Sequence, residues 1–305
     1  MGQGFYFYSC YGQTIKSRID LSSLKLSSFS PSQITEIDIE IKVLDKKIKN
    51  LDLLDNQTSI NLDYGYYHRK GLALFEFLDG REINVTRYVN TDINEDFIRI
   101  LLNYPIACLL YQKGYFLLHA SAVSYLNKVF LFPGKSLSGK STIAAFLIKQ
   151  GGKLITEDTA VIKIEQEKAL IFPSYPLIKI SDQANKNFKF FKEDGISFPK
   201  EANKRKGYFL SKEETVKDEM PIDYCIFPKW TNGETKLKEN DLKSSLNLLL
   251  ESSLSIYPLT QEKEKDLFQK NIQLLKHVDS LSYLRQKKFS SLLDLKNILN
   301  QKLAQ

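Results

Sequence analysis

A run of eight residues near the middle of the chain, from Gly134 to Ser141, constrains the fold more than any other feature of the sequence. It places four residues between two glycines and follows the second glycine with Lys140 and Ser141. Glycines let the backbone curl so that successive N–H groups point into one concavity, which binds an anion. In such a loop the lysine contacts the β- and γ-phosphates of a nucleotide, and the hydroxyl coordinates Mg²⁺. The residues predicted to contact the nucleotide are Gly134, Lys135, Ser136, Leu137, Ser138, Gly139, Lys140, Ser141 and Thr142. Lys135 fits a solvated surface position as well as a phosphate contact.

The residues on both sides of this run predict the β-α-β unit in which phosphate-binding loops occur. An apolar strand over 128–132 leads into the run, and a helix over 142–150 follows it. Gly151 and Gly152 end that helix, and a second strand is expected over 153–156. This order predicts an α/β domain that binds ATP together with Mg²⁺.

Two adjacent acids, Glu157 and Asp158, follow the second strand of this unit. The end of that strand returns to the edge of the sheet at which the loop lies. Phosphoryl transfer needs an acid that holds Mg²⁺ and one that orients or deprotonates the acceptor. The pair is therefore predicted to be catalytic, with Ser141 and Asp158 as the metal ligands; a solvated turn is the alternative. His119 lies in an apolar stretch just before the loop strand and fits a buried core position as well as an active-site role.

The rest of the chain divides at residue 92. Residues 1–92 are predicted to be mostly β, because apolar residues alternate in them and Asp79-Gly80 is a hairpin signal. Residues 93–305 are predicted to form the nucleotide-binding domain, which begins with a helix that runs to about residue 113. The charged segment 183–220 lacks apolar periodicity, so we expect a mobile flap there. As a lid, it would bring Lys200, Lys204, Arg205 and Lys206 over the phosphates; an inert insertion is the alternative. The C-terminal part is expected to contain helices near 240–252, 261–277 and 290–303, with a strand over 280–285.

Composition excludes some partners. The 43 lysines and arginines are scattered among 36 acidic residues, and the net charge of +7 is not concentrated in a stripe, so no nucleic-acid partner is predicted. The most apolar stretch, 97–111, is short and interrupted by Arg99 and Pro105, so no membrane association is predicted. Three cysteines stand far apart without a metal-binding spacing, which is typical of reduced thiols in a cytoplasmic protein. The oligomeric state stays open, a homo-oligomer included.

Four stretches of the chain resemble the HPr kinase/phosphorylase family, and in particular its shorter relatives from bacterial peptide-modification clusters. These stretches are His-Ala-Ser-Ala-Val at 119–123, the loop at 133–142, the helix end, strand and acidic pair at 147–158, and the proline-containing strand at 173–180. The resemblance implies a P-loop kinase core akin to phosphoenolpyruvate carboxykinase and the ATP-dependent phosphorylation of a serine hydroxyl. It also implies that Lys140 binds phosphate, that Ser141 binds metal and that His119 belongs to the active site.

The chain departs from the family at two points. Glu157 stands where the first acid of the pair is usually Asp, so it stays open which carboxylate is the base. The glycine- and arginine-rich signature that follows in HPr kinases is not visible, so HPr is not the expected substrate, and a reverse phosphorylase activity is unsupported. The expected acceptor is a serine of a ribosomally made precursor peptide, of the lasso type among others, or of a small protein. A small-molecule hydroxyl kinase and a non-catalytic nucleotide-binding regulator are the alternatives.

Overall fold

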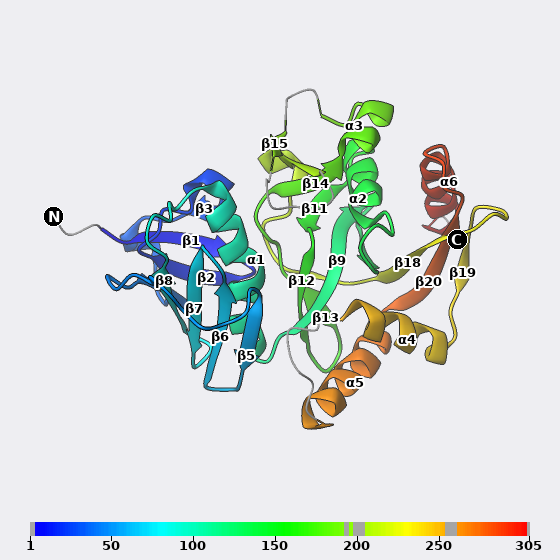
Figure 1. Cartoon of the computed structure of the whole chain (residues 1–305). Helices are drawn as coiled ribbons and strands as arrows, with labels where there is room; N and C mark the ends of the chain where they lie inside the picture. Colours follow the sequence, from blue (N-terminus) through cyan, green and yellow to red (C-terminus); the bar gives the residue numbers. More distant parts are fainter. Residues whose placement is uncertain (1–3, 192–194, 198–204, 254–260, 304–305) are drawn as a thin grey trace. The chain divides into compact units, whose positions relative to one another are not determined.

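The computed structural model of the chain describes residues 4–191, 195–197, 205–253 and 261–303, without the side chains of 261–263. It divides into two compact units (Figure 1). The first contains Met1–Leu117 and Ser255–Gln261, and the second contains Leu118–Leu254 and Glu262–Gln305. The first unit therefore extends beyond residue 92, where the sequence was expected to divide.

The described residues of the first unit form an eight-stranded mixed sheet in the order β3-β1-β2-β4-β8-β7-β6-β5. The β2–β4 and β4–β8 pairs are parallel, whereas β1–β2, β7–β8 and β6–β7 are antiparallel. The predicted hairpin turn lies between β7 and β8, where Asp79 and Gly80 both have a positive φ. The strands are β1 (Tyr6–Cys10), β2 (Gln13–Ser17), β3 (Ser27–Ser28), β4 (Ile39–Val43), β5 (Gln57–Ile60), β6 (Tyr64–Arg69), β7 (Ala73–Leu78) and β8 (Glu82–Arg87), with 3-10 helices η1 (Ser22–Leu24) and η2 (Pro31–Gln33) between them.

Helix α1 (Glu95–Gln112) belongs to the first unit because its apolar face packs on this sheet. The helix begins at Asn94, whose side chain accepts a hydrogen bond from the backbone N–H of Phe97. Phe97 is fully buried, and its ring lies 5.8 Å from that of Phe75 on β7. Pro105 lies inside the helix without ending it. The sequence located this helix correctly, and its packing explains why the first unit extends to Leu117.

The second unit is built on a nine-stranded mixed sheet in the order β17-β13-β12-β9-β10-β18-β20-β19, in which β11 also pairs with β9. Strands β10 and β11 are both antiparallel to β9, so they run in the same direction on either side of it. Helix α2 connects them, which gives the predicted β-α-β unit. The strands are β9 (Phe116–Tyr125), β10 (Lys128–Pro133), β11 (Lys153–Thr156), β12 (Thr159–Ile164), β13 (Ala169–Ile171), β17 (Met220–Pro221), β18 (Tyr224–Trp230), β19 (Lys236–Glu239) and β20 (Asp279–Arg285).

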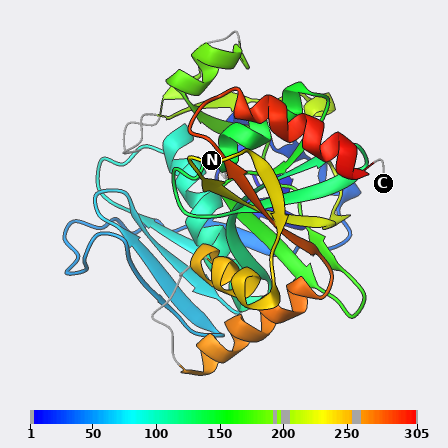
Figure 2. The same ribbon diagram turned by 90° about the vertical axis from the view of Figure 1, so that its right-hand side faces the viewer.

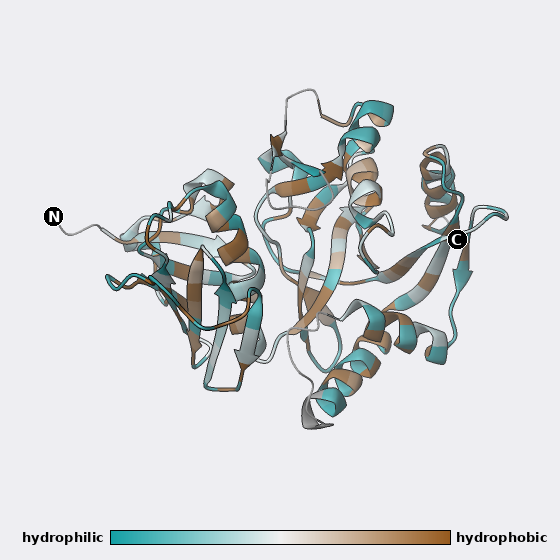
Figure 3. Cartoon of the chain, in the orientation of Figure 1, coloured by the Kyte–Doolittle hydropathy of each residue, from teal (hydrophilic) through white to brown (hydrophobic). Residues whose placement is uncertain are grey.

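Helices cover both faces of this sheet. Figures 1 and 2 show α2 and α6 on one face and α4 and α5 on the other. The core beneath α2 and α6 joins apolar residues of the two helices to Phe130, Phe132 and Tyr283 of the sheet. Figure 3 shows hydrophobic residues along the strands and on the helices that pack against them. The helices are α2 (Lys140–Lys149), α4 (Leu242–Ser252), α5 (Gln261–Leu275) and α6 (Ser291–Leu303).

The segment 183–220, for which the sequence predicts a mobile flap, contains regular secondary structure in its described residues. Its described residues form a helix and part of a three-stranded antiparallel sheet in the order β14-β16-β15. Lys200 and Lys204 lie outside the described residues. The elements of this region are β14 (Leu177–Ser181), α3 (Asp182–Phe188), β15 (Ile196–Ser197), β16 (Arg205–Phe209) and the 3-10 helix η3 (Lys212–Glu214).

Aromatic packing explains why this segment folds. The rings of Phe188 and Phe190 stack at 4.9 Å, and those of Phe191 and Tyr208 stack at 4.6 Å. These side chains belong to or pack against the same core as α2. Apolar periodicity did not reveal them because the aromatic residues are separated by charged ones rather than spaced as on one helix.

No helix within the described ranges has both the length and the hydropathy that crossing a bilayer requires. Cys10, Cys108 and Cys225 are buried and free of disulfide bonds.

Candidate functional site

The predicted loop lies between the end of β10 at Pro133 and the start of α2 at Lys140. Both motif glycines adopt conformations that L-amino acids rarely reach, with φ of 151° at Gly134 and 95° at Gly139. Leu137, at the outer tip of the loop, has a φ of 68° and is 74% exposed. The backbone therefore makes the tight curl that the two glycines predicted.

Lys140 turns back into this loop instead of toward solvent. Its ammonium donates hydrogen bonds of 2.8 Å to the carbonyl of Gly134 and 3.0 Å to that of Lys135. The side chain is 5% exposed, and its burial lowers the pKa of the ammonium, while the charges of Glu157 and Asp158 act in the opposite direction. The loop thus holds a buried cation at the N-terminus of a helix, where an anion is favoured.

The remaining loop residues lie in different environments, and the hydroxyl of Ser138 is buried without a hydrogen-bond partner among the described residues. Ser136, Ser141 and Thr142 line the cavity in front of the loop. Lys135 instead points away from it, is largely exposed and forms a 3.1 Å ion pair with Glu251 of α4. Of its two predicted positions, Lys135 occupies the surface one in this structure.

Glu157 follows β11 and is buried beside the loop. Its Oε2 accepts a 2.6 Å hydrogen bond from the Ser121 hydroxyl, whereas its Oε1 is buried and has no hydrogen-bond partner among the described residues. Burial and the charge of Asp158 raise the pKa of the Glu157 carboxyl to about 7, and the hydroxyls of Ser121 and Ser141 partly oppose this shift. The Glu157 carboxyl thus lies close to the hydroxyl of Ser141, the predicted metal ligand.

Asp158 occupies a left-handed backbone position, with a φ of 64°, and has a different environment. Its carboxylate forms ion pairs with Lys179 of β14 and with Arg205 of β16, the latter at 3.7 Å. Burial alone would raise the pKa of this carboxyl, but the charges of Lys179 and Arg205 outweigh it and hold the pKa well below its usual range. The two adjacent acids therefore differ strongly in proton affinity.

His119 on β9 connects the acidic pair to the loop. Its Nδ1 lies 2.9 Å from the backbone carbonyl of Asp158, which can only accept, so Nδ1 carries the proton. Its own carbonyl accepts a 3.3 Å hydrogen bond from the N–H of Gly134. Burial and the charge of Lys140 lower the pKa of the imidazole, which favours the neutral form with an unprotonated Nε2. His119 lines the cavity, so the core alternative does not describe it.

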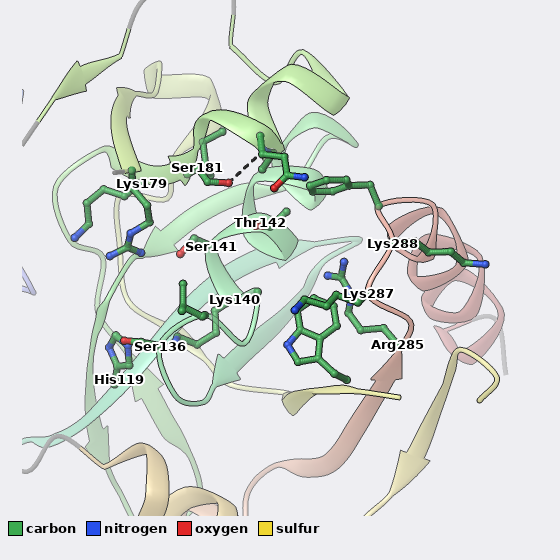
Figure 4. A pocket seen from close by; sticks show the side chains of 18 residues that line it. His119, Ser136, Lys140, Ser141, Thr142, Lys179, Ser181, Arg285, Lys287 and Lys288 are labelled. Atoms are coloured by element: carbon green, nitrogen blue, oxygen red, sulfur yellow. Dashed lines mark hydrogen bonds between the residues drawn. The ribbon is translucent and has the colours of Figure 1, made fainter. Parts of the chain in front are cut away.

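A cavity of about 570 Å³ extends in front of the loop (Figure 4). Residues of β9, the loop, α2, β14, α3, β16, β18, β20 and the segment after β20 line it. Among the described lining residues six are cationic and none is acidic; the cations are Lys140, Lys179, Arg205, Arg285, Lys287 and Lys288. Such a lining favours a ligand that carries several negative charges. The acidic pair is not part of this lining, but Asp158 forms ion pairs with two of its cations, Lys179 and Arg205.

Sequence reasoning assigned no role to several of the residues that line the cavity. The available signal was that Lys179 interrupts the apolar strand 177–181. In the structure this lysine is 3% exposed, and a lysine buried in such a strand needs a charged partner. Trp230 carried no signal beyond its aromatic character. Arg205 was expected over the phosphates as a residue of the lid, and it lines the cavity, whereas no role was predicted for Arg285. Lys206, expected near the phosphates, instead pairs with Asp182 at 3.7 Å.

The described residues hold no cluster of three or more His, Cys, Asp or Glu side chains that could bind a metal ion alone. Mg²⁺, however, is commonly held by one or two protein oxygens together with substrate phosphates. The unpartnered Oε1 of Glu157 and the hydroxyl of Ser141 are hard oxygen donors of this kind, and they fit that ion.

Neither a protein-family model nor a curated protein matches the chain. Among solved structures, the chain is similar to the Hpr(Ser) kinase/phosphatase from Coxiella burnetii, with a TM-score of 0.33 and 13% sequence identity. The match covers 62% of this chain and 97% of that chain. At this TM-score the likeness carries no argument about the site, whose chemistry rests on its own residues.

Proposed function

We propose that this chain is an ATP-dependent kinase that transfers the γ-phosphate of ATP to a serine hydroxyl of a peptide or small protein. One observation carries the proposal: the glycine loop and the buried Lys140 open onto a cavity that is lined by cations and adjoins two acids of different proton affinity. A nucleoside triphosphate fits the cationic lining. The two acids supply the metal ligand and the base that phosphoryl transfer needs. The proposed fold class is a P-loop kinase core.

The phosphates are proposed to lie at the N-terminus of α2. There the loop N–H groups and the helix dipole favour negative charge, and the ammonium of Lys140 is already buried beside them. On binding, Lys140 exchanges its hydrogen bonds to the carbonyls of Gly134 and Lys135 for phosphate oxygens. It then stabilises the charge that spreads over the γ-phosphoryl group in the transition state.

Ser141 and Glu157 are proposed to hold Mg²⁺, which when bound neutralises charge on the phosphates. This assignment replaces Asp158 with Glu157 as the acidic ligand. The reason is that Glu157 has an unpartnered buried oxygen, whereas both oxygens of Asp158 face cations. A carboxyl with a pKa of about 7 also ionises readily once a cation is near it.

Asp158 is proposed to act on the acceptor. Lys179 and Arg205 both line the cavity and form ion pairs with its carboxylate, so they neutralise it. Phosphates compete for these two cations, so their binding exposes the carboxylate to the acceptor hydroxyl. The serine oxygen then forms a bond to the γ-phosphorus, the bond to the bridging oxygen breaks and releases ADP, and the serine proton passes to Asp158. His119 positions Asp158 through its backbone carbonyl and fixes the loop through Gly134.

The serine acceptor is proposed from the sequence resemblance to peptide-modifying relatives of HPr kinases. Mass spectrometry of serine-containing peptides after incubation with Mg-ATP tests the proposal, and the same mixture with excess chelator is the control. The proposal predicts a phosphate on serine only when Mg²⁺ is free. Phosphorylation of an added small-molecule alcohol, with none on any peptide, would point to the small-molecule kinase instead.

A further inference from the structure

Two strands of the second unit end beside the start of α2 and bring an aromatic and a cationic side chain together there. Trp230, the last residue of β18, pairs in register with Arg285, the last residue of β20. Paired residues of neighbouring strands point to the same face, and the guanidinium lies 4.7 Å from the centre of the indole ring. A Cβ at Gly139 would lie 3.5 Å from Nη1 of Arg285 and 3.8 Å from the Trp230 ring.

Arg285 is buried, and some of the hydrogen-bond donors of its guanidinium lack an acceptor among the described residues. It is 2% exposed, and within the described part of the chain its Nε and Nη1 have no hydrogen-bond partner. A buried cation without acceptors costs free energy unless a ligand supplies them. Because Arg285 lines the cavity, the missing acceptor belongs to whatever occupies that cavity.

Trp230 is the counterpart that offers an apolar surface. It is the only tryptophan in the chain, lines the same cavity and is 44% exposed. Phe289 lines the cavity as well, and an edge-on contact at 5.5 Å with Phe188 holds its ring. Figure 4 shows Arg285 and Lys287 on one side of Lys140, with His119 and Lys179 on the other. The cavity therefore has an aromatic end and an end that adjoins the acids.

We propose that the aromatic end binds the purine base of the nucleotide, which stacks on Trp230, while Arg285 donates to the phosphate oxygen nearest the nucleoside. This inference rests on the proposed function. The γ-phosphate must point toward the acids, so a triphosphate seated on the loop directs its nucleoside to the opposite end. Stacking on an indole suits a flat heteroaromatic base, and a phosphate oxygen satisfies a guanidinium.

The single tryptophan gives a direct test. The full chain is titrated with Mg-ATP and, separately, with magnesium tripolyphosphate, which has the phosphates but no base. Binding is followed by calorimetry and by fluorescence excited selectively at tryptophan. The expected result is that both ligands bind, that ATP binds more tightly and that only ATP strongly quenches the emission of Trp230.

Variants separate stacking from a structural effect. Trp230→Leu is expected to weaken ATP binding about tenfold and to leave tripolyphosphate binding unchanged. Trp230→Phe, which keeps a ring, should lose less. Phe268→Leu, which changes an aromatic residue of similar exposure (43%) on α5, is the matched control and should change neither affinity.

The outcomes distinguish this inference from the proposed function. Equal affinity for both ligands, no change in Trp230 emission and no effect of Trp230→Leu would overturn the base site alone. If neither ligand binds, the proposed function fails and the base site with it. Tripolyphosphate binding that falls together with ATP binding in both Trp230 variants would likewise overturn the base site, because it would reveal a purely structural role.

Discussion

Lys140 is the residue whose removal the proposed chemistry tolerates least. Lys140→Ala should lower the rate of ADP formation by a factor of about 10² or more, because it removes the cation that the loop backbone aims at the phosphates. Lys135→Ala is the matched control, since this neighbouring lysine is 71% exposed at its side chain and pairs with Glu251 on the surface. It should change the rate less than about threefold. A similar rate in the Lys140 variant and in the wild type would refute the assignment of the loop.

Glu157 and Asp158 differ in environment, and their substitutions should differ in kind. Glu157→Gln should raise the Mg²⁺ concentration required for half-maximal activity, because it removes the proposed metal ligand with the unpartnered oxygen. Asp158→Asn should lower the maximal rate with little change in that concentration, because it removes only the proposed base. Magnesium titrations of both variants, with the wild type alongside, measure the two effects. The roles are exchanged if Asp158→Asn is the variant that needs more Mg²⁺.

The raised pKa of Glu157 should make the stability of the folded chain depend on pH. In the unfolded chain this carboxyl ionises at its usual pKa, near 4.5, whereas in the folded chain it keeps its proton up to about pH 7. The folded state thus binds more protons between these values, so stability falls as the pH rises through this window and stays lowered above it. Without Mg²⁺, Glu157→Gln should melt at a higher temperature than the wild type at pH 8, and this difference should be much smaller at pH 4.5. Calorimetric melting at both pH values measures it; a difference that is independent of pH would contradict the assignment.

Sequence reasoning succeeded for the elements whose patterns are local. The hairpin at Asp79-Gly80, the cap at Asn94 and the loop between β10 and α2 were all predictable, because a few adjacent residues determine each. The order of strands in the sheets was not predictable. Strand β9 lies between β10 and β11, and only pairing between residues far apart in the sequence determines this order. The ion pairs of Asp158 were hidden for the same reason, because Lys179 and Arg205 come from elements later in the chain.

The region from α3 to β16 gives a prediction at the level of the element. Phe190 is 4% exposed and stacks on Phe188, so Phe190→Ala should lower the free energy of unfolding by about 3 kcal/mol. Phe268→Ala on α5, at an exposed position, should cost less than about 1 kcal/mol. Denaturant unfolding of the two variants measures the difference. Equal stabilities would restore the interpretation of this segment as a loop that lacks a packed core.

Across the whole molecule, every residue proposed for the chemistry lies in the second unit, on elements from β9 to the residues that follow β20. The sequence predicted the loop, Lys140, Ser141, the acidic pair and His119 as candidate site residues. The fold added the charges that distinguish the two acids and the side chains of β14, β16, β18 and β20 that complete the cavity. Those contributions come from distant parts of the chain, and no local pattern of residues encodes them.

Transfer of a labelled γ-phosphate to serine tests the central claim most directly. The chain is incubated with Mg²⁺, γ-labelled ATP and a library of serine-containing peptides, and a second library with alanine in place of serine is the control. Label is expected on serine in the first library and none in the second, and Lys140→Ala should lower the rate by a factor of about 10² or more. Labelling that Lys140→Ala leaves unchanged would contradict it, as would the absence of any transfer to serine by a chain that binds Mg-ATP.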